Sequence, residues 1–409
     1  MRHRSLLIIA SVVTTGALTL TACGSRDAKG SDSAGGGGTT VVIGVDAPLT
    51  GDLSALGLGI KNSVDLAVKQ ANEKGYVKGV TFEINALDDQ AQPSSGQQNA
   101  TKLVADKNVL GVVGPLNSSV AESMQKVFDD AKLVQVSPAN TSPSLSQGQN
   151  WNGGEKKRPF ASYFRTATTD AIQGPFAAQY LVNTAKKKKV FLIDDKKTYG
   201  AGLAATFKAE YTKLGGTVAG EDHVDPETKD FSSVVTKIKS SGADVVYYGG
   251  EYPAAGPLSK QIKKAGAKIP LVGGDGIYSA DFIKLSGKEG EGDLATSVGA
   301  PVETLPSAKD FVANYKKAGY KDRYEAYGGY SYDAAWAIIE AVKKLVDDNG
   351  GKLPDGARGK VIEAMKGVSF DGVTGKVSFD EFGDTTNKQL TVYQYKGGAW
   401  APVKSGTLG

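Results

Sequence analysis

The stretch that decides the fold runs from residue 41 to residue 136 and opens with Val41-Val42-Ile43-Gly44-Val45. This apolar run is continuous rather than alternating, which is typical of a parallel strand covered on both faces. Further strands are predicted at 81–87, 109–113 and 133–136, and amphipathic helices separate them at 60–72, 97–107 and 118–131. Strands that alternate with helices in this way predict a doubly wound parallel sheet.

The same alternation restarts after Phe164-Arg165. Strands are predicted at 190–193, 217–223, 244–248 and 269–272, between helices at 171–185, 201–214, 231–240 and 254–265. Two long helices at 308–317 and 326–347 follow, and strands at 375–379, 390–395 and 399–403 come last. The fold class is therefore α/β, with two doubly wound parallel-sheet lobes, each too short to form a barrel.

The amino-acid composition excludes several classes of protein. The 409 residues include 40% hydrophobic and 22% charged residues, which excludes a disordered or fibrous chain. A net charge of +4 is too balanced for a protein that binds nucleic acid by neutralising phosphates, so no nucleic-acid partner is expected. One cysteine and two histidines exclude a disulfide framework and a Cys/His zinc site. We expect no metal and no cofactor.

The N-terminus has the pattern of an export signal. Arg2 and Arg4 precede an apolar run at 6–20 that is too short for a stable membrane span, and Leu20-Thr21-Ala22-Cys23 ends it. This ending resembles the bacterial lipobox, so residues 1–22 are expected to be a lipoprotein signal peptide and Cys23 to be lipidated. A buried structural cysteine is the alternative. The Gly- and Ser-rich residues 23–40 predict a flexible tether to the membrane.

Enzyme motifs are missing from the sequence. A Ser-His-Asp triad would have to use His223, because His3 leaves with the signal peptide, and no Gly-x-Ser-x-Gly sequence presents a nucleophile. Neither a Gly-x4-Gly-Lys-Ser/Thr loop nor a His-Glu-x2-His helix occurs. We therefore expect no enzyme and interpret His223 as a surface or packing residue.

The predicted strands end in small and polar residues. Ligands of doubly wound sheets bind beyond the carboxyl ends of the strands, so these residues are the candidates for a site. Ser118 falls near a helix N-terminus, where hydroxyl and N–H groups hold an anion, although a plain helix-capping serine is an equal alternative. The glycine pairs at 249–250 and 273–274 would let a ligand approach the backbone, or serve as simple turns.

The body of the chain resembles the leucine/isoleucine/valine-binding proteins, which have the type I periplasmic binding protein fold and feed ABC importers. No single segment is diagnostic, but the matching segments occur in family order. They are Ile43-Gly44-Val45, Pro48-Leu49-Thr50-Gly51, Asn72-Glu73-Lys74-Gly75, Asp88-Asp89, Gly114-Pro115, Ser137-Pro138-Ala139-Asn140-Thr141, Phe164-Arg165-Thr166, Gln173-Gly174, Tyr199-Gly200, Lys229-Asp230-Phe231, Tyr247-Tyr248-Gly249-Gly250 and Tyr332-Asp333-Ala334.

The resemblance implies an amino acid held between the two lobes. Ser118, Ala139 and Thr141 match the residues that bind the α-carboxylate through hydroxyl and backbone N–H groups, with the Ala139 carbonyl available to the ammonium group. The family's acidic partner of the ammonium group matches Asp275, shortened here from the usual glutamate. A carboxylate suits that position because an ammonium group must be paired once the cleft excludes water.

The remaining site residues lie around the expected ligand side chain. Tyr199 and Tyr327 match aromatic positions that close over the ligand. Leu56 falls where several relatives have tryptophan, and Glu251 falls where relatives have tyrosine. The extra acid weakens the case for a purely aliphatic ligand and permits one with a polar or cationic group.

Two further departures from the family pattern stand out. Ala91 and Asn117 fall where some relatives have a disulfide. Residues 147–159 look like an insertion, which contains Trp151 and a basic run. We expect this insertion to border the cleft or a partner, or to be a solvated loop.

The resemblance also implies the domain organisation and partners. Lobe one is expected to comprise 41–167 and 300–384, and lobe two 168–299 and 385–403, with three crossings forming a hinge. We expect a monomer, lipid-anchored on the extracytoplasmic face of the cell membrane, that delivers a branched-chain or similar amino acid to an ABC permease and its ATPase subunits. The alternatives are a protein of this fold that binds a small amide or urea, and a ligand-sensing receptor lobe without transport; receptor versions usually continue into a membrane span.

Overall fold

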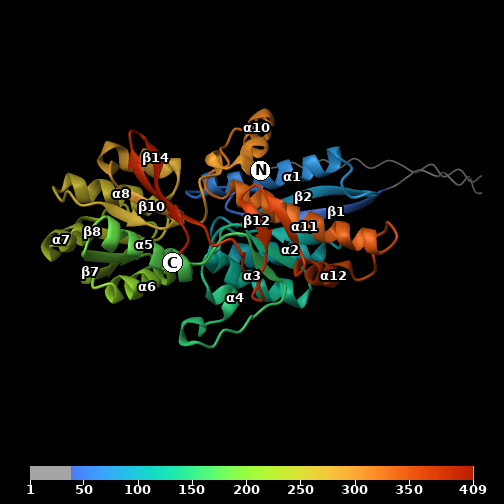
Figure 1. The fold of residues 1–409 in the computed structure, drawn as a ribbon, viewed down its shortest axis with the longest axis horizontal. Coiled ribbons are helices and arrows are strands. Elements are labelled where there is room, and N and C mark those ends of the chain that lie inside the picture. The colour runs from blue at the N-terminus through green and yellow to red at the C-terminus, as the bar shows by residue number, and fades with distance from the viewer. Residues whose placement is uncertain (1–37, 409) are drawn as a thin grey trace, which may run out of the picture. The chain divides into compact units, whose positions relative to one another are not determined.

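The computed structural model describes residues 38–408, and the predicted signal peptide with Cys23 lies outside them. The first lobe is built on a five-stranded parallel sheet in the order β2-β1-β3-β4-β5 (Figure 1). Its strands are β1 (Thr39–Ala47), β2 (Val80–Asp88), β3 (Val109–Val113), β4 (Val134–Ser137) and β5 (Tyr163–Arg165). All four strand pairs are parallel, which confirms the doubly wound prediction for this lobe.

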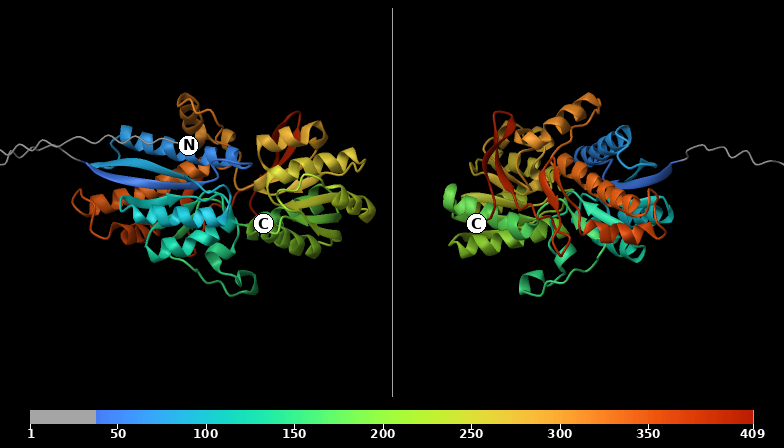
Figure 2. Two further views of the ribbon diagram at one scale, coloured as in Figure 1. Left: turned by 180° about the vertical axis from the view of Figure 1, so that it is seen from behind. Right: turned by 45° about the vertical axis from the view of Figure 1, so that its right-hand side comes forward.

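The second lobe repeats this strand order. Its parallel strands run β7-β6-β8-β9-β10, the same 2-1-3-4-5 arrangement, with β13 and β14 added antiparallel beside β10. The strands are β6 (Lys189–Asp194), β7 (Thr217–His223), β8 (Val245–Gly249), β9 (Leu271–Gly273), β10 (Leu294–Ser297), β13 (Leu390–Lys396) and β14 (Ala399–Gly406). Figure 2 shows the last two strands, in red, beside the second lobe although they end the chain. The fold class is confirmed.

Helices cover both sheets. The first lobe has α1 (Ser54–Glu73) against α11 (Gly328–Asp348), α2 (Pro93–Ala105) against α3 (Ser118–Asp130), and α12 (Ala357–Met365) against β3. The second has α5 (Asp170–Gln179) against α6 (Thr198–Lys213), and α8 (Tyr252–Lys264) against α7 (Ser232–Ser241) and α9 (Ala280–Ser286). The short helix α4 (Ser144–Gln147), α10 (Lys309–Lys317) and the hairpin of β11 (Ser369–Gly372) and β12 (Gly375–Ser378) complete the elements named here.

The local sequence explains these elements. Val41, Ile43 and Val45 are fully buried in β1, and Ile60, Val64 and Ala67 turn one face of α1 to the core. Apolar spacing of this kind stabilises both elements through burial rather than through intrinsic propensity. Among the described residues, none of the helices combines the length and apolar character needed to cross a membrane.

The structure differs from the expected elements in several places. The helix expected over 171–185 ends at Gln179, and residues 180–184 continue it as a π-helical turn. The proline at 175 has no backbone N–H to donate, which weakens a regular helix at this point. Thr39 and Thr40, assigned to the tether, begin β1. The sequence analysis overlooked β5, β10, β11, α4, α9 and α12, all short elements whose apolar pattern spans too few residues to show a period.

A buried ion pair joins two segments that lie near the expected hinge crossings at 167 and 384. Arg165 at the end of β5 donates from Nε to Asp384 Oδ1 at 2.6 Å, and both side chains are almost completely buried. Arg165 also donates to the carbonyl groups of Asn140 and Ser142 at 3.0 and 2.8 Å. The expected lobe limits and hinge remain predictions.

The insertion at 147–159 is tied to the first lobe at both ends. Gln147 Nε2 donates to Asp384 Oδ2 at 2.8 Å, and Arg158 donates to the carbonyl groups of Glu381, Ala161 and Tyr163, while residues 152–157 between them are exposed. The ends of the segment are therefore structural, although the insertion was expected to border the cleft or a partner or to be a solvated loop.

Candidate functional site

A small cavity lies beyond the carboxyl ends of the central strands of both sheets. Asn117 and Ser118 follow β3, Glu251 follows β8, and Asp275 follows β9. These positions flank the points where the strand order reverses, which is where doubly wound sheets bind ligands. The cavity is lined by Leu56, Leu116, Asn117, Ser118, Ala139, Tyr199, Glu251, Asp275, Gly276 and Tyr327.

Seven of the eight residues expected at a ligand site line this cavity, and Thr141 does not. The free space measures about 20 Å³, room for about one water molecule. An amino acid therefore enters only if the walls move apart. Whether these residues bind a ligand remains a prediction.

Asp275 is the most heavily bonded residue of the cavity wall. Its side chain is fully buried, and its two oxygens accept hydrogen bonds from Tyr199 at 2.8 Å, Tyr327 at 2.8 Å and Gln173 at 2.9 Å. Tyr199 in turn accepts the backbone N–H of Gly276 at 3.0 Å. Both tyrosines thus orient the carboxylate as well as lining the cavity. Among the described residues, no lysine or arginine forms a salt bridge with Asp275.

Burial raises the pKa of Asp275, although the hydrogen bonds from Gln173, Tyr199 and Tyr327 favour its charged form. A carboxylate in such a place gains from a cation that approaches through the cavity, since the cation offsets the loss of hydration. The site is therefore electrostatically suited to a positively charged group.

Thr141 serves a second buried acid instead of the cavity. Its hydroxyl donates to Asp170 Oδ2 at 3.0 Å, and Gln173 bridges Asp170 to Asp275 with bonds of 3.0 and 2.9 Å. Burial and the charge of Asp275 raise the pKa of Asp170 to about 8. Thr141 thus lies outside the cavity lining, and its hydroxyl orients Asp170, which Gln173 connects to the cavity-lining Asp275.

Ser118 and Ala139 follow strands of the first sheet, whereas Asp275 follows a strand of the second. Ser118 is the first residue of α3, and the N-cap residue before it, Asn117, forms no side-chain capping bond to that helix. The N–H of Ala139 donates to Ser137 Oγ at 3.2 Å, so it is already partly engaged. The hydroxyl of Ser118 and the positive end of α3 are the groups best placed here for a carboxylate.

Asn117, Leu116 and Gly276 line the cavity but were overlooked as site residues. Asn117 was noted only as a position that has a cysteine in some relatives, and its Nδ2 donates to Glu251 Oε1 at 2.6 Å. Glu251 Oε2 also lies 3.4 Å from Lys197 Nζ. No local signal marks Asn117 as a ligand-facing residue, because its partner lies 134 residues away.

The glycine pairs mostly make room for the protein itself. A Cβ atom at Gly249 would lie 2.1 Å from the carbonyl oxygen of Gly200, and one at Gly274 would lie 2.4 Å from the Tyr199 hydroxyl. These glycines are therefore explained by the close packing of the ends of β8 and β9 against α6, rather than by the approach of a ligand. None of these four glycines lines the cavity; the glycine that does is Gly276.

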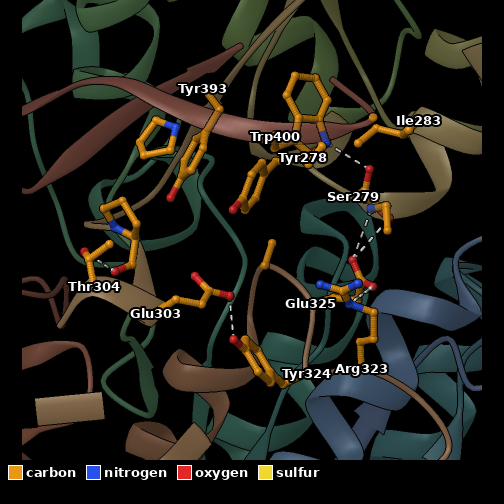
Figure 3. Close-up of a pocket in the computed structure, with 16 residues that line it drawn as sticks. Tyr278, Ser279, Ile283, Glu303, Thr304, Arg323, Tyr324, Glu325, Tyr393 and Trp400 are labelled. Carbon is orange, nitrogen blue, oxygen red and sulfur yellow. Dashed lines mark hydrogen bonds and ion pairs between the residues drawn. The ribbon is translucent and has the colours of Figure 1, made fainter. Parts of the chain in front are cut away.

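A separate cavity of about 370 Å³ is lined by aromatic and acidic side chains, shown in Figure 3. Tyr324 donates to Glu303 Oε1, and Glu325 accepts from Ser279 Oγ at 3.3 Å. Trp400 Nε1 donates to the carbonyl of Ser279 at 2.9 Å. Glu325 therefore links the segment before α11 to the segment before α9. His223 lies elsewhere on the surface, paired with Asp194 at 2.8 Å.

The family model described as periplasmic binding protein matches residues 40–399. The chain belongs to this family. This is a family of substrate-binding proteins. Two curated relatives are each 32% identical to this chain. A Leu/Ile/Val-binding protein homolog 1 of Brucella suis aligns over 360 residues, which cover 88% of this chain and 91% of the relative. For the Leu/Ile/Val-binding protein BraC3 of Rhizobium johnstonii, the alignment covers 88% of this chain and 92% of the relative.

Solved structures support the same fold. A leucine-binding protein from Thermotoga maritima is 26% identical, has a TM-score of 0.77 and is matched over 89% of this chain and 98% of its own. A solute-binding protein from Rhodopseudomonas palustris, solved with benzoate, has a TM-score of 0.78 at 20% identity, with shares of 90% and 97%. At that identity the second likeness shows the fold alone.

Proposed function

We propose that this protein captures a free α-amino acid between its two lobes outside the cytoplasm and delivers it to an ABC importer. The observation that carries this proposal is the buried Asp275 carboxylate, which faces the cavity without a basic partner among residues 38–408. Ser118 at the start of α3 offers the complementary anion site across the cavity. A zwitterion meets both requirements with one small molecule.

Each proposed ligand contact follows from this geometry. Asp275 accepts the ammonium group, while Tyr199 and Tyr327 hold the carboxylate of Asp275 in place and contribute ring surface. The hydroxyl of Ser118 donates to the ligand carboxylate, and the carbonyl group of Ala139 is available to accept from the ammonium group. Leu56 and Glu251 border the ligand side chain. Thr141 acts indirectly, through Asp170 and Gln173.

Ligand uptake requires the lobes to separate and close again, because the cavity has room for about one water molecule. Bonds between the lobes would stabilise the closed state: Asn117 donates to Glu251 at 2.6 Å, Thr198 donates to Glu122 at 3.0 Å, and Lys229 lies 3.5 Å from Asp52. The ligand adds contacts that exist only when the lobes are closed and so shifts the population towards that state. The closed form presents the surface that a permease recognises.

The names of the relatives favour a branched-chain or similar amino acid. The family implies an extracytoplasmic location, and the lipobox-like sequence at Cys23 supports a lipid anchor there. We propose that the protein acts as a monomer in this role. A small amide or urea remains the alternative ligand for the same cavity.

A thermal-shift panel tests the proposal. The purified protein is heated with each of the twenty amino acids, with their N-acetyl and amide derivatives, and with urea. We expect an amino acid to raise Tm and both of its derivatives to fail, because each derivative removes one of the two charges. A shift from urea or an amide, with none from any amino acid, would contradict the proposal.

A further inference from the structure

Glu251 separates two cavities. One is the small cavity described above, and the other is a chamber of about 420 Å³. Loops that follow strands of both lobes enclose the chamber, and its lining comprises Thr50, Gly51, Asp52, Leu53, Gln90, Ala91, Gln92, Lys197, Pro226, Glu227, Tyr248, Glu251, Pro253 and Ala254. A ligand side chain that passes Glu251 would therefore enter a space much larger than the cavity that holds the α-carbon.

The wall beside Glu251 has a hydrogen-bond acceptor with no donor. Asn117 Oδ1 is buried and has no partner among the described residues. The orientation of the amide follows from its partner: the Glu251 oxygens that lie near Asn117 and near Lys197 Nζ accept hydrogen bonds, so Nδ2 of Asn117 faces Glu251 at 2.6 Å. Asn117 Oδ1 then faces away from Glu251, in a residue that lines the cavity. A buried acceptor left unpaired is costly, and it gains from any donor that arrives.

A neighbouring acceptor makes the same demand, because Oδ2 of Asp195 is buried without a partner in the described chain. The hydroxyl of Tyr248, which lines the chamber, is also buried and unpaired among the described residues, and it can donate as well as accept. Asp195 lies close enough to Glu251 that their charges repel. Lys197 is the cation on this wall, and it is already engaged by Glu251 at 3.4 Å. The region around Glu251 therefore has more acceptors than donors.

We infer that the bound amino acid has a long side chain ending in N–H donors, which bond to Asn117 Oδ1 and Glu251 at the entrance of the chamber. This inference rests on the proposed function and names the substrate class within it. Carboxamide, ureido, guanidinium and ammonium groups share the required chemistry. An aliphatic side chain would bury Asn117 Oδ1 unpaired and should bind about ten-fold or more weakly.

Calorimetric titration of the purified protein with L-glutamine, L-citrulline, L-arginine, L-lysine, L-leucine and L-norleucine tests the inference. We expect at least one donor-bearing amino acid to bind about ten-fold or more tightly than leucine and norleucine. Tight binding of glutamine or citrulline identifies a neutral donor, and tight binding of arginine or lysine identifies a cation. L-Norleucine is the matched control for the length of the side chain.

Two variants locate the contact. Asn117→Leu should weaken the donor-bearing ligand about ten-fold or more beyond its effect on leucine, because both ligands lose the Asn117–Glu251 bond between the lobes but only the donor-bearing ligand loses a bond of its own. A merely unfolded variant would weaken both ligands alike. Glu251→Gln should weaken the same ligand, while Glu289→Gln, a matched change on the same lobe, should leave it unchanged. Preferential binding of leucine or norleucine by the unaltered protein would overturn the inference and leave the proposed function standing. Failure of every amino acid to bind would overturn both.

Discussion

Replacing Asp275 with asparagine should separate ligand binding from folding. Asparagine keeps the size of the side chain and its ability to accept from Gln173 and Tyr199, and its amide group can donate to the hydroxyl of Tyr327. The variant therefore retains the hydrogen bonds now measured at 2.9, 2.8 and 2.8 Å while it removes the negative charge. The change tests the charge of Asp275 alone.

The expected loss of affinity follows from the complete burial of the carboxylate. Removing one partner of a buried, hydrogen-bonded charge pair costs about 2 kcal/mol or more, which corresponds to roughly 30-fold in Kd. The ligand-free protein should respond in the opposite sense. Because burial raises the pKa of Asp275, its charged form costs stability when no cation is present, so the variant should have an equal or higher Tm.

Calorimetry measures the first effect, and thermal unfolding without ligand measures the second. Asp281→Asn, on the outer helix α9, is the matched control and should leave affinity unchanged. Unaltered affinity in Asp275→Asn would refute the assignment of the ammonium partner. A large fall in Tm without ligand would show that Asp275 acts mainly as a structural acid.

Three further predictions concern other parts of the chain. Arg165→Met leaves Asp384 charged and buried without its partner, so urea unfolding should show a loss of about 3–5 kcal/mol, and a loss under 1 kcal/mol would contradict the role given to this pair. Asp170 has a pKa raised to about 8, so the folded chain keeps a proton that the unfolded chain releases above about pH 4. Stability should therefore fall as pH rises from about 4 to 8, and Asp170→Asn should flatten that fall; an unchanged profile would exclude Asp170 as its source. Cys23→Ala should move the protein from the membrane fraction to the soluble fraction on cell fractionation, and retention in the membrane would disprove the lipid anchor.

Much of the architecture could be predicted because its strands are long apolar runs and its helices have a clear apolar face. The strand at 109–113 and the strand at 217–223 were placed to the residue. The three residues of β5 and the four of β10 lie below the length at which a pattern is visible. Partners such as Arg165 and Asp384, 219 residues apart, become neighbours only through the fold.

The site could be predicted in part for similar reasons. Residues directly after strands, such as Ser118 and Asp275, reach the cavity because parallel strands end at one edge of a sheet. Thr141 also follows a strand, but its hydroxyl turns to Asp170, a residue that no local pattern linked to it. Asn117 resembles an ordinary turn residue in the sequence, and its pairing with Glu251 joins loops from different lobes.

A crystal structure of the protein with the amino acid that gives the largest thermal shift would test the central claim most directly. Our account predicts one ligand molecule in the cavity between the strand ends, its ammonium group within hydrogen-bond distance of Asp275 and its carboxylate on Ser118. A ligand bound in the cavity beside Tyr278 and Trp400, or one in the central cavity whose ammonium group avoids Asp275, would contradict it.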